Sequence, residues 1–146
     1  MWMDLASTPQ PLVWKATRPG AYGLVAGQGR ASTPLDYLDR LWIAEHVLGF
    51  PWELEGVWLD EYGRPRFVTT QIFMPGRPAT EAEIHHYLTH LDFHLLDDPA
   101  LGPLWINSTL GVVISDAYPD NFVMVDETEL FPVDLALAPQ ISWRRG

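Results

Sequence analysis

The sequence predicts a single α+β domain, and three observations point to it. The chain has 146 residues, which suits one domain with a sizeable core. Apolar residues make up 47% of it and seven residues are tryptophan, so we expect a packed globular protein and not a disordered one. Two capped helical segments alternate with short apolar strands, and 13 prolines with 11 glycines indicate many turns between them.

The composition indicates which classes of binding partner suit this protein. A net charge of −10 disfavours nucleic acid, because binding phosphates along a backbone needs clustered Lys and Arg. A nucleotide needs only a few local donors and a metal. The absence of cysteine excludes disulfides, thiolate zinc sites and cysteine nucleophiles. No apolar run approaches the roughly 18 residues of a membrane helix, and the N-terminus lacks a basic-then-apolar signal, so we expect a cytoplasmic protein with no membrane partner.

Three strands are predicted in the first half of the chain. They cover residues 12–16, 54–60 and 66–73, and the last two are joined by a hairpin turn whose glycine can take positive φ. A glycine-rich connection at residues 20–29 does not match GxGxxG and has no strand-turn-helix context. We interpret it as an ordinary flexible loop, because glycine mainly supplies conformational freedom.

A helix is predicted at residues 34–48. Thr33 can cap its N-terminus and Pro34 suits the first turn. Gly49 and Pro51 end it. At about 100° per residue, an apolar stripe forms on one side of this helix; its members are Leu35, Leu38, Leu41, Trp42 and Leu48.

Glu45 falls in the middle of that stripe. A carboxylate on an apolar face is unusual, because burying it without a partner is costly. It needs a cation, and Lys15 on the preceding strand is the leading candidate. The alternative is that Glu45 lies at a frayed edge and is solvated. Both interpretations stay open at this point.

The second half is predicted to contain a helix and a hairpin. A capping box at residues 80–83 begins a helix that runs to about residue 91. The hairpin pairs residues 122–125 with residues 130–133, and periodicity does not decide between helix and strand for residues 104–106. The core face of the helix is expected to comprise Ile84, Tyr87, Leu88 and Leu91.

His86, His90 and His94 are spaced by four residues, which resembles a metal-binding stripe on a helix. His86 and His90 face away from the apolar residues Ile84 and Leu88, and the HExxH arrangement is missing. His94 is expected beyond the helix end. We therefore interpret the three as solvated surface residues, with a histidine-based metal protein as the third functional alternative.

A polar motif follows the apolar run at residues 112–114. Asp116 ends that run, Asn121 comes five residues later, and Asp134 lies thirteen residues past Asn121 at the end of another apolar strand. Strand ends are places where a rigid scaffold presents polar groups to a cleft. The spacing D-x4-N followed by x12-D is that of the catalytic loop and metal-binding aspartate of protein kinases.

Three segments carry a resemblance to a known family. The first contains Val13-Trp14-Lys15, Pro19-Gly20 and residues 31–38. The middle one covers residues 68–80, VTTQIFMPGRPAT, with Glu83-Ile84, and the last is SDAYPDNF at residues 115–122. Over residues 12–138 the chain resembles the kinase-like domain of polyvalent proteins of phages and other mobile elements, a predicted serine/threonine/tyrosine kinase family.

The resemblance implies a reduced protein-kinase-like fold in one domain covering residues 1–146. Residues 12–73 would be the N-lobe-like part, a small antiparallel sheet with a helix. Residues 74–138 would be a reduced C-lobe-like part, a truncated helical lobe with a β-hairpin. A nucleotide would bind between the two parts.

The resemblance also implies roles for individual residues. Lys15 would hold nucleotide phosphates and Glu45 would pair with it. The hinge at residues 71–76, including Gln71, Phe73 and Met74, would meet the adenine of ATP. Asp116 would accept the hydroxyl proton, and Asn121 and Asp134 would bind Mg²⁺, a hard cation that prefers oxygen ligands.

Departures from the kinase pattern leave two functional alternatives open. Ser115 and Ile114 stand where kinases have arginine and histidine, Leu135-Ala136 replaces Phe-Gly, and no glycine-rich phosphate loop precedes Lys15. The first alternative is an ATP/Mg²⁺-binding enzyme that transfers the γ-phosphoryl group to an unknown protein or small-molecule hydroxyl. The second is a pseudokinase or protein-interaction module, for which a homo-oligomer also stays open.

Overall fold

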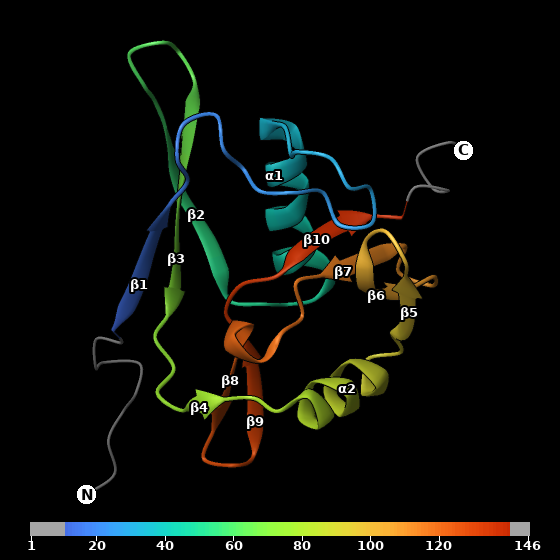
Figure 1. The fold of residues 1–146 in the computed structure, drawn as a ribbon. Coiled ribbons are helices and arrows are strands. Elements are labelled where there is room, and N and C mark those ends of the chain that lie inside the picture. The colour runs from blue at the N-terminus through green and yellow to red at the C-terminus, as the bar shows by residue number, and fades with distance from the viewer. Residues whose placement is uncertain (1–10, 141–146) are drawn as a thin grey trace, which may run out of the picture.

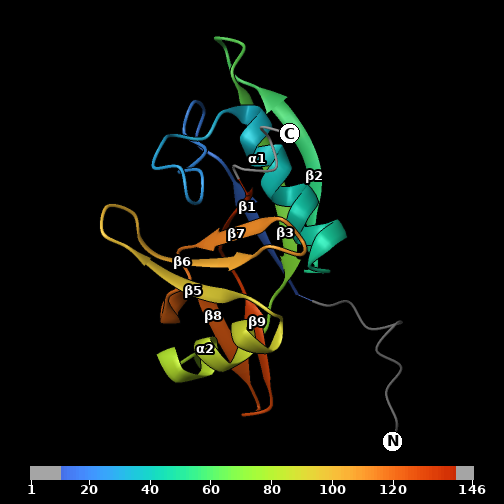
Figure 2. The same ribbon diagram turned by 90° about the vertical axis from the view of Figure 1, so that its right-hand side faces the viewer.

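The fold is α+β, as the sequence predicts. The computed structural model describes residues 11–140, and in this part of the chain it contains two α-helices and three small antiparallel sheets (Figures 1 and 2). The helices are α1, Pro34–Trp42, and α2, Glu81–His90. A π-helical turn, η1, Ile43–Val47, continues α1, and a short 3-10 turn, η2, Pro119–Asn121, precedes β8. Neither described helix is long and apolar enough to cross a membrane.

The first sheet confirms the three strands predicted in the first half. Its order is β1–β3–β2, with β1 at Leu12–Ala16, β2 at Trp52–Leu59 and β3 at Pro65–Ile72. β1 and β3 pair with Lys15 opposite Thr69, and a bulge interrupts β2 between Leu54 and Gly56. Paired residues of an antiparallel sheet share a face. Lys15 and Thr69 therefore point to the same side.

The helix after this sheet begins as predicted but buries a different face. Thr33 forms a capping box with Asp36, and the α-helix gives way to a π-turn in which Leu48 N donates to Ile43 O at 3.0 Å. The buried residues of α1 and η1 are Leu41, Ile43 and Ala44, whereas Leu35 and Trp42 of the expected stripe are exposed. Leu35 and Trp42 lie within α1 itself, so this side of the α-helix faces solvent, and the 3.6-residue projection no longer applies from Ile43 onward, where the π-turn changes the angular step between successive side chains.

The second and third sheets contain more strand than the sequence predicts. The second has the order β10–β7–β6–β5 and the third the order β4–β8–β9. The hairpin β8–β9 and the core positions Ile84 and Leu88 of α2 are confirmed, but Leu91 is exposed. Residues 104–106 belong to a strand, and α2 is the one α-helix between residues 74 and 138, so the expected helical lobe is largely β-structure. The strands are β4 Arg77–Pro78, β5 His94–Asp98, β6 Gly102–Asn107, β7 Val112–Ser115, β8 Phe122–Val125, β9 Glu129–Pro132 and β10 Ala136–Pro139.

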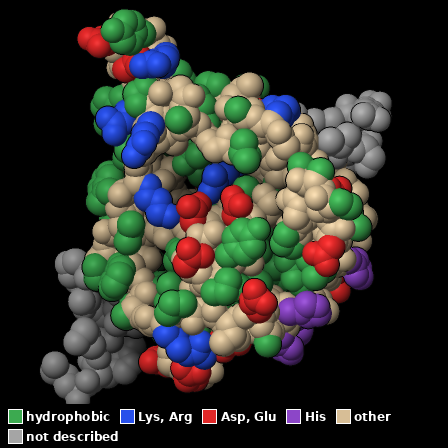
Figure 3. All heavy atoms as spheres, viewed as in Figure 1, with side chains coloured by type: hydrophobic (Ala, Val, Ile, Leu, Met, Phe, Trp, Pro, Cys, Tyr) green, Lys and Arg blue, Asp and Glu red, His purple; other side chains and the backbone are tan. Residues whose placement is uncertain are grey.

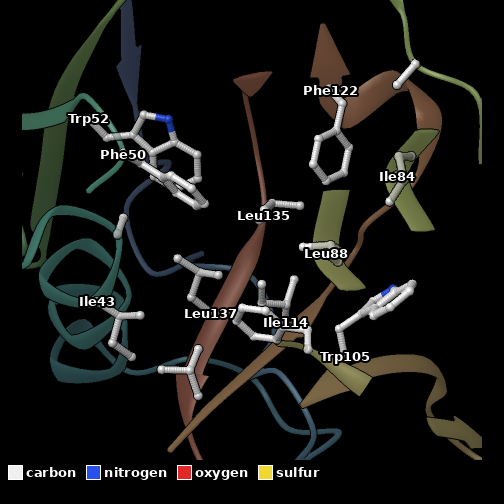
Figure 4. Close-up of a cluster of buried hydrophobic side chains, with 14 residues drawn as sticks. Ile43, Phe50, Trp52, Ile84, Leu88, Trp105, Ile114, Phe122, Leu135 and Leu137 are labelled. Carbon is white, nitrogen blue, oxygen red and sulfur yellow. The ribbon is translucent and has the colours of Figure 1, made fainter. Parts of the chain in front are cut away.

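The main core lies where the three sheets and both helices meet. Figure 4 shows Leu135 between Phe50 and Trp52 on one side and Phe122 and Leu88 on the other. Leu135, Leu88 and Phe122 are almost completely removed from solvent. Burial of each such side chain stabilises the fold by about 1.5–3 kcal/mol. The core therefore fixes the backbone on both sides of Leu135.

The glycine-rich connection at residues 20–29 is packed against the second sheet. Val25 and Ala26 are buried in a smaller cluster with Leu104 and Val113. Gly27 has φ +76°, and a Cβ at this position would lie 3.2 Å from Val113. The connection is thus closely packed against the second sheet, in contrast to the flexible loop expected from composition alone.

Candidate functional site

Lys15 projects from the inner face of β1 and reaches the far half of the chain. Its Nζ donates a hydrogen bond to the carbonyl oxygen of Val133 at 2.5 Å, across 118 positions of sequence. Burial is the main cause that lowers the pKa of Lys15, and the nearby carboxylate of Asp134 opposes this shift. Lys15 is also the only lysine of the chain. The structure thus places a partly buried amine beside the predicted metal-binding aspartate.

Asp134 is held in place by the core residue next to it. Leu135 is completely buried, while more than half of the Asp134 side chain is exposed. Its carboxylate forms an ion pair with the guanidinium of Arg40 on α1. The preceding residue, Val133, accepts from Lys15, and Trp52 Nε1 donates to Pro132 O at 3.3 Å. Three side chains of the first half therefore hold three consecutive residues, 132–134.

Asp116 and Asn121 belong to the same hydrogen-bonded cluster. Asp116 follows β7 with φ +60°, a left-handed conformation that is uncommon for a residue other than glycine. Its carbonyl oxygen accepts from Asn121 Nδ2 at 2.6 Å and from the backbone of Tyr118 at 2.9 Å. Val133 N in turn donates to Asn121 O at 2.8 Å. An unbroken series of contacts thus links Lys15 through Val133 and Asn121 to Asp116.

Glu45 does not take the position that the helical projection predicts. Its side chain is more than half exposed, and within residues 11–140 its ion pair is with His46 at 3.6 Å and not with Lys15. The π-turn that contains Glu45 turns it away from the buried face. The solvated alternative for Glu45 therefore describes the structure. Arg40, five positions earlier on α1, forms the ion pair with Asp134.

The predicted hinge residues lie at the junction between the first and third sheets. Gln71, on β3, lines the same small cavity as Lys15 and Asp134. Phe73 is half exposed and its backbone N–H donates to Pro11 O at 2.8 Å, while Met74 is partly buried. Of these three residues, Gln71 is the one that borders the cluster.

The cavity beside Lys15 is small. Its volume is about 30 Å³, which is close to the space of one water molecule in the liquid. On the face of the molecule that is turned to the viewer in Figure 1, Figure 3 shows basic and acidic side chains gathered around a hollow. A much larger cavity, about 490 Å³, lies elsewhere, between α2 and the β8–β9 hairpin, and has mainly apolar walls. The polar chemistry and the open volume therefore occur at different places. The lining of the small cavity is Lys15, Tyr37, Arg40, Leu41, Trp52, Thr69, Gln71, Val133 and Asp134.

Histidine and carboxylate groups do not form a ready metal centre. Among the described residues, no three His, Cys, Asp or Glu side chains lie close enough together to hold a metal ion. His86 and His90 are exposed on α2 with stacked rings 6.4 Å apart, and His94 lies beyond the helix on β5, as the sequence predicts. Asp134 and Asn121 offer one carboxylate and one amide oxygen. Such a set suits Mg²⁺ that brings most of its ligands with it, as water or phosphate.

Arg40 and Tyr37 are the site residues that sequence reasoning missed. Both lie on α1 three positions apart, so they share a side of the helix. The Arg40 guanidinium lies 5.6 Å from the centre of the Tyr37 ring, and burial raises the pKa of Tyr37. The three-residue spacing of Tyr37 and Arg40 is visible in the sequence. The sequence does not show which side of α1 faces Asp134.

Comparisons with known proteins found no matching family model, no matching curated protein and no matching solved structure. The residues and their geometry in this chain therefore carry the functional conclusion.

Proposed function

We propose that the chain is a kinase-like domain that binds ATP with Mg²⁺ at the cluster formed by Lys15, Asp116, Asn121 and Asp134. The observation that carries the proposal is the series of hydrogen bonds from Lys15 to Asp116 through Val133 and Asn121. The residues involved come from three separate segments of the chain. Electrostatic stabilisation of phosphate needs such preorganised cations and oxygen ligands in one place.

The order of elements adds support to the proposal. A strand carrying Lys15 is followed by a helix, two more strands, a connection with the short strand β4, a second helix, the three strands β5 to β7, the Asp116–Asn121 loop, a hairpin and Asp134. β7, before Asp116, pairs with β10, after Asp134. This pairing brings the two ends of the motif side by side.

The oxygen donors fit Mg²⁺ held together with a nucleotide. Asp134 would provide a carboxylate oxygen, and Asn121 would provide its amide oxygen, since its amide nitrogen is bound to Asp116 O. Mg²⁺ would neutralise charge on the phosphates. Because the chain offers so few ligands, we expect Mg²⁺ without nucleotide to bind weakly.

Each residue of the cluster has a separate role in phosphoryl transfer. Lys15 holds phosphate oxygens, and the Asp116 carboxylate takes the proton of an acceptor hydroxyl as its oxygen bonds to the γ-phosphorus. The bond from that phosphorus to the bridging oxygen breaks, and ADP leaves with the electron pair. The acceptor is an unknown protein or small-molecule hydroxyl.

Binding requires the site to open. A cavity of about 30 Å³ is far below the roughly 300–1,000 Å³ of typical small-molecule pockets. Lys15 must release Val133 O, and Arg40 must release Asp134, before phosphates reach both side chains.

Thermal unfolding with and without ligand tests the binding step. ATP with Mg²⁺ is expected to raise Tm, since a ligand at about 100 times its Kd stabilises the folded state by about 2.7 kcal/mol. ATP alone is expected to raise Tm less, and Asp134→Ala is expected to remove the difference between the two conditions. Arg64→Gln, which alters a distant arginine–aspartate pair, is the matched control. Absence of any shift with millimolar ATP and Mg²⁺ would refute nucleotide binding.

Transfer is tested separately on a protein that binds. Autophosphorylation or ADP release is expected in the wild type and is expected to fall by about 10²- to 10⁴-fold in Asp116→Asn, because the general base is removed. Nucleotide binding by that variant should persist. Activity that survives the substitution would exclude Asp116 as the base.

A non-catalytic interaction module is the second candidate, and an exposed apolar sheet face favours it. Leu12, Trp14, Ile72 and Trp58 are all substantially exposed. Leu12 pairs with Ile72, so these two residues share a face of the sheet. Exposed apolar patches often mark association sites. A pseudokinase would keep the ATP-dependent rise in Tm and show no transfer, and a homo-oligomer would appear in light scattering as a mass above 16.6 kDa.

A further inference from the structure

Arg40 is the cation that forms an ion pair with Asp134, and neither the motif spacing nor the apolar pattern marks it. It lies on α1, and about one-fifth of its side chain is exposed. Its guanidinium is the ion-pair partner of Asp134, 94 positions away in sequence. The helix therefore presents an arginine to the site where the resemblance predicts a glutamate.

The group formed by Lys15, Arg40 and Asp134 contains two cations and one carboxylate. Lys15 and Arg40 both act on the single carboxylate of Asp134, and Arg40 in turn contributes to lowering the pKa of Lys15. This local surplus stands in a chain whose net charge is −10. Two cations that share one carboxylate are ready to accept a further anion.

The Arg40 guanidinium is held by its surroundings. The Tyr37 ring lies 5.6 Å from it, and that ring stacks on Phe67 at 5.1 Å. A Cβ added to Gly23 would lie 3.9 Å from Arg40 Nη1, so the glycine-rich connection passes close by. An arginine fixed against an aromatic ring loses less freedom when it binds an oxyanion.

We propose that Arg40 is a phosphate-binding residue of this site and that its ion pair with Asp134 is exchanged when a polyphosphate binds. Asp134 then turns to Mg²⁺, and Arg40 donates together with Lys15 to phosphoryl oxygens. The inference rests on the proposed nucleotide function for its biological ligand. The ligand class is a polyphosphate chain, because a planar guanidinium matches two phosphate oxygens at once.

The exchange gives Asp134 opposite effects with and without metal. With Mg²⁺, the carboxylate supports binding. Without Mg²⁺, it repels the polyphosphate and keeps Arg40 occupied. Asp134→Asn therefore weakens binding of ATP with Mg²⁺ and strengthens binding of metal-free polyphosphate. A purely structural Arg40–Asp134 pair produces no such reversal of sign.

Isothermal titration calorimetry with two probes tests the exchange. The probes are ATP with Mg²⁺ and inorganic tripolyphosphate in EDTA, each titrated into wild type, Arg40→Gln, Asp134→Asn and the double variant. Arg40→Gln is expected to weaken ATP–Mg²⁺ binding by roughly 10- to 100-fold, the effect of losing a hydrogen bond between charged groups. Asp134→Asn is expected to tighten tripolyphosphate binding about tenfold or more, and adding Arg40→Gln is expected to cancel that gain. Arg64→Gln is the control, since it removes the guanidinium of another arginine–aspartate pair.

The outcomes separate this inference from the proposed function. Unchanged ATP–Mg²⁺ affinity in Arg40→Gln overturns the role of Arg40 and leaves nucleotide binding intact. If no variant binds ATP with Mg²⁺ but Asp134→Asn binds tripolyphosphate through Arg40, the nucleotide function fails and the anion site stands. Tripolyphosphate affinity that is the same in Asp134→Asn and in wild type overturns the exchange. Arg40→Lys, which keeps the charge without the planar fork, gives a folded variant expected to have an intermediate affinity.

Discussion

Two clusters of charged side chains among the described residues have opposite compositions. The cleft cluster, Lys15, Arg40 and Asp134, sets two cations against one carboxylate. The clip cluster, Arg77, Glu83 and Glu127, sets one cation against two carboxylates. The cleft cluster joins the first half of the chain to the second. The clip joins β4, α2 and the β8–β9 turn.

In the clip, two carboxylates surround one cation, whereas in the cleft cluster two cations share one carboxylate. Arg77 donates to both oxygens of Glu83 and both oxygens of Glu127, and Glu83 also accepts from the backbone of Thr80 in the capping box of α2. These contacts raise the pKa of Arg77 and lower that of Glu83 to about 2. In the cleft the pKa of Lys15 is lowered instead. The clip is thus suited to fasten the chain, while the cleft retains capacity for an anion.

The largest effect is expected from Gly76→Ala, which should detach the clip. A Cβ on Gly76 would lie 2.2 Å from Met124 O and 2.7 Å from Val123, so β4 has to move away from β8. Overpacking of this kind costs about 1–3 kcal/mol. Urea or thermal unfolding should show this loss, and hydrogen exchange should quicken at Arg77 and its strand partner Met124.

Gly49→Ala is the control for Gly76→Ala. Nothing lies within 4 Å of a Cβ at Gly49, although its φ of +69° adds strain of about 1–2 kcal/mol. Exchange at β4 and β8 should be unchanged in this variant. Equal exchange rates at Met124 in Gly76→Ala and wild type would show that β4 does not depend on the close approach.

Local sequence signals predicted the parts of the fold that local chemistry decides. The N-cap at Thr33 and the capping box at residues 80–83 predicted two helix starts, and the structure confirms both. The strand that carries Lys15 and the hairpin after Asn121 were equally visible, because apolar alternation and turn residues act over a few positions. β5 was not predicted and residues 104–106 of β6 were left undecided, since β5 pairs with β6 and β6 with β7 through contacts that no local pattern contains.

The candidate site was predictable only in part for a related reason. Asp116, Asn121 and Asp134 stand out by spacing, and the structure links them by hydrogen bonds and adjacent backbone. The rotation of α1 brings Arg40 to Asp134, and the π-turn that contains Glu45 begins only after Arg40. A helical projection assumes a constant angular step. It therefore fails where the backbone departs from the α-helix.

Acid titration is expected to reveal the clip as a smaller effect. The folded-state pKa of Glu83 is about 2, below its unfolded value near 4.3, so the Arg77 contact stabilises the fold fully above about pH 4.5. This stability is lost as the pH falls from there towards 2, and the lowered pKa of Glu127 acts in the same direction. Arg77→Gln is expected to lower Tm by a few degrees at pH 7 and by progressively less towards pH 2.

The Arg30–Asp36 pair supplies the control for this titration. It also holds the pKa of its carboxyl at about 2, so wild type and Arg77→Gln share its acid loss, and their difference isolates the clip. Urea unfolding at several pH values between 2.5 and 7 measures that difference. A gap between the two proteins that stays constant with pH would show that Arg77 acts by packing and not by charge.

The smallest effect is expected at the cleft, on the alkaline side. Because the folded-state pKa of Lys15 lies below its ordinary value of 10.5, the unfolded chain binds the proton more tightly, and the contribution of Lys15 to stability rises as the pH increases between the two values. Reductive methylation with ¹³C-formaldehyde labels the only lysine, and its NMR shift against pH gives the pKa, with the same protein in urea as reference. Asp134→Asn is expected to lower this pKa further and Arg40→Gln to raise it, since the first removes an attractive charge and the second a repulsive one. Movement of the pKa in the same direction in both variants would mean that Lys15 does not sense the two charges separately, and the cleft would then lack the surplus that distinguishes it from the clip.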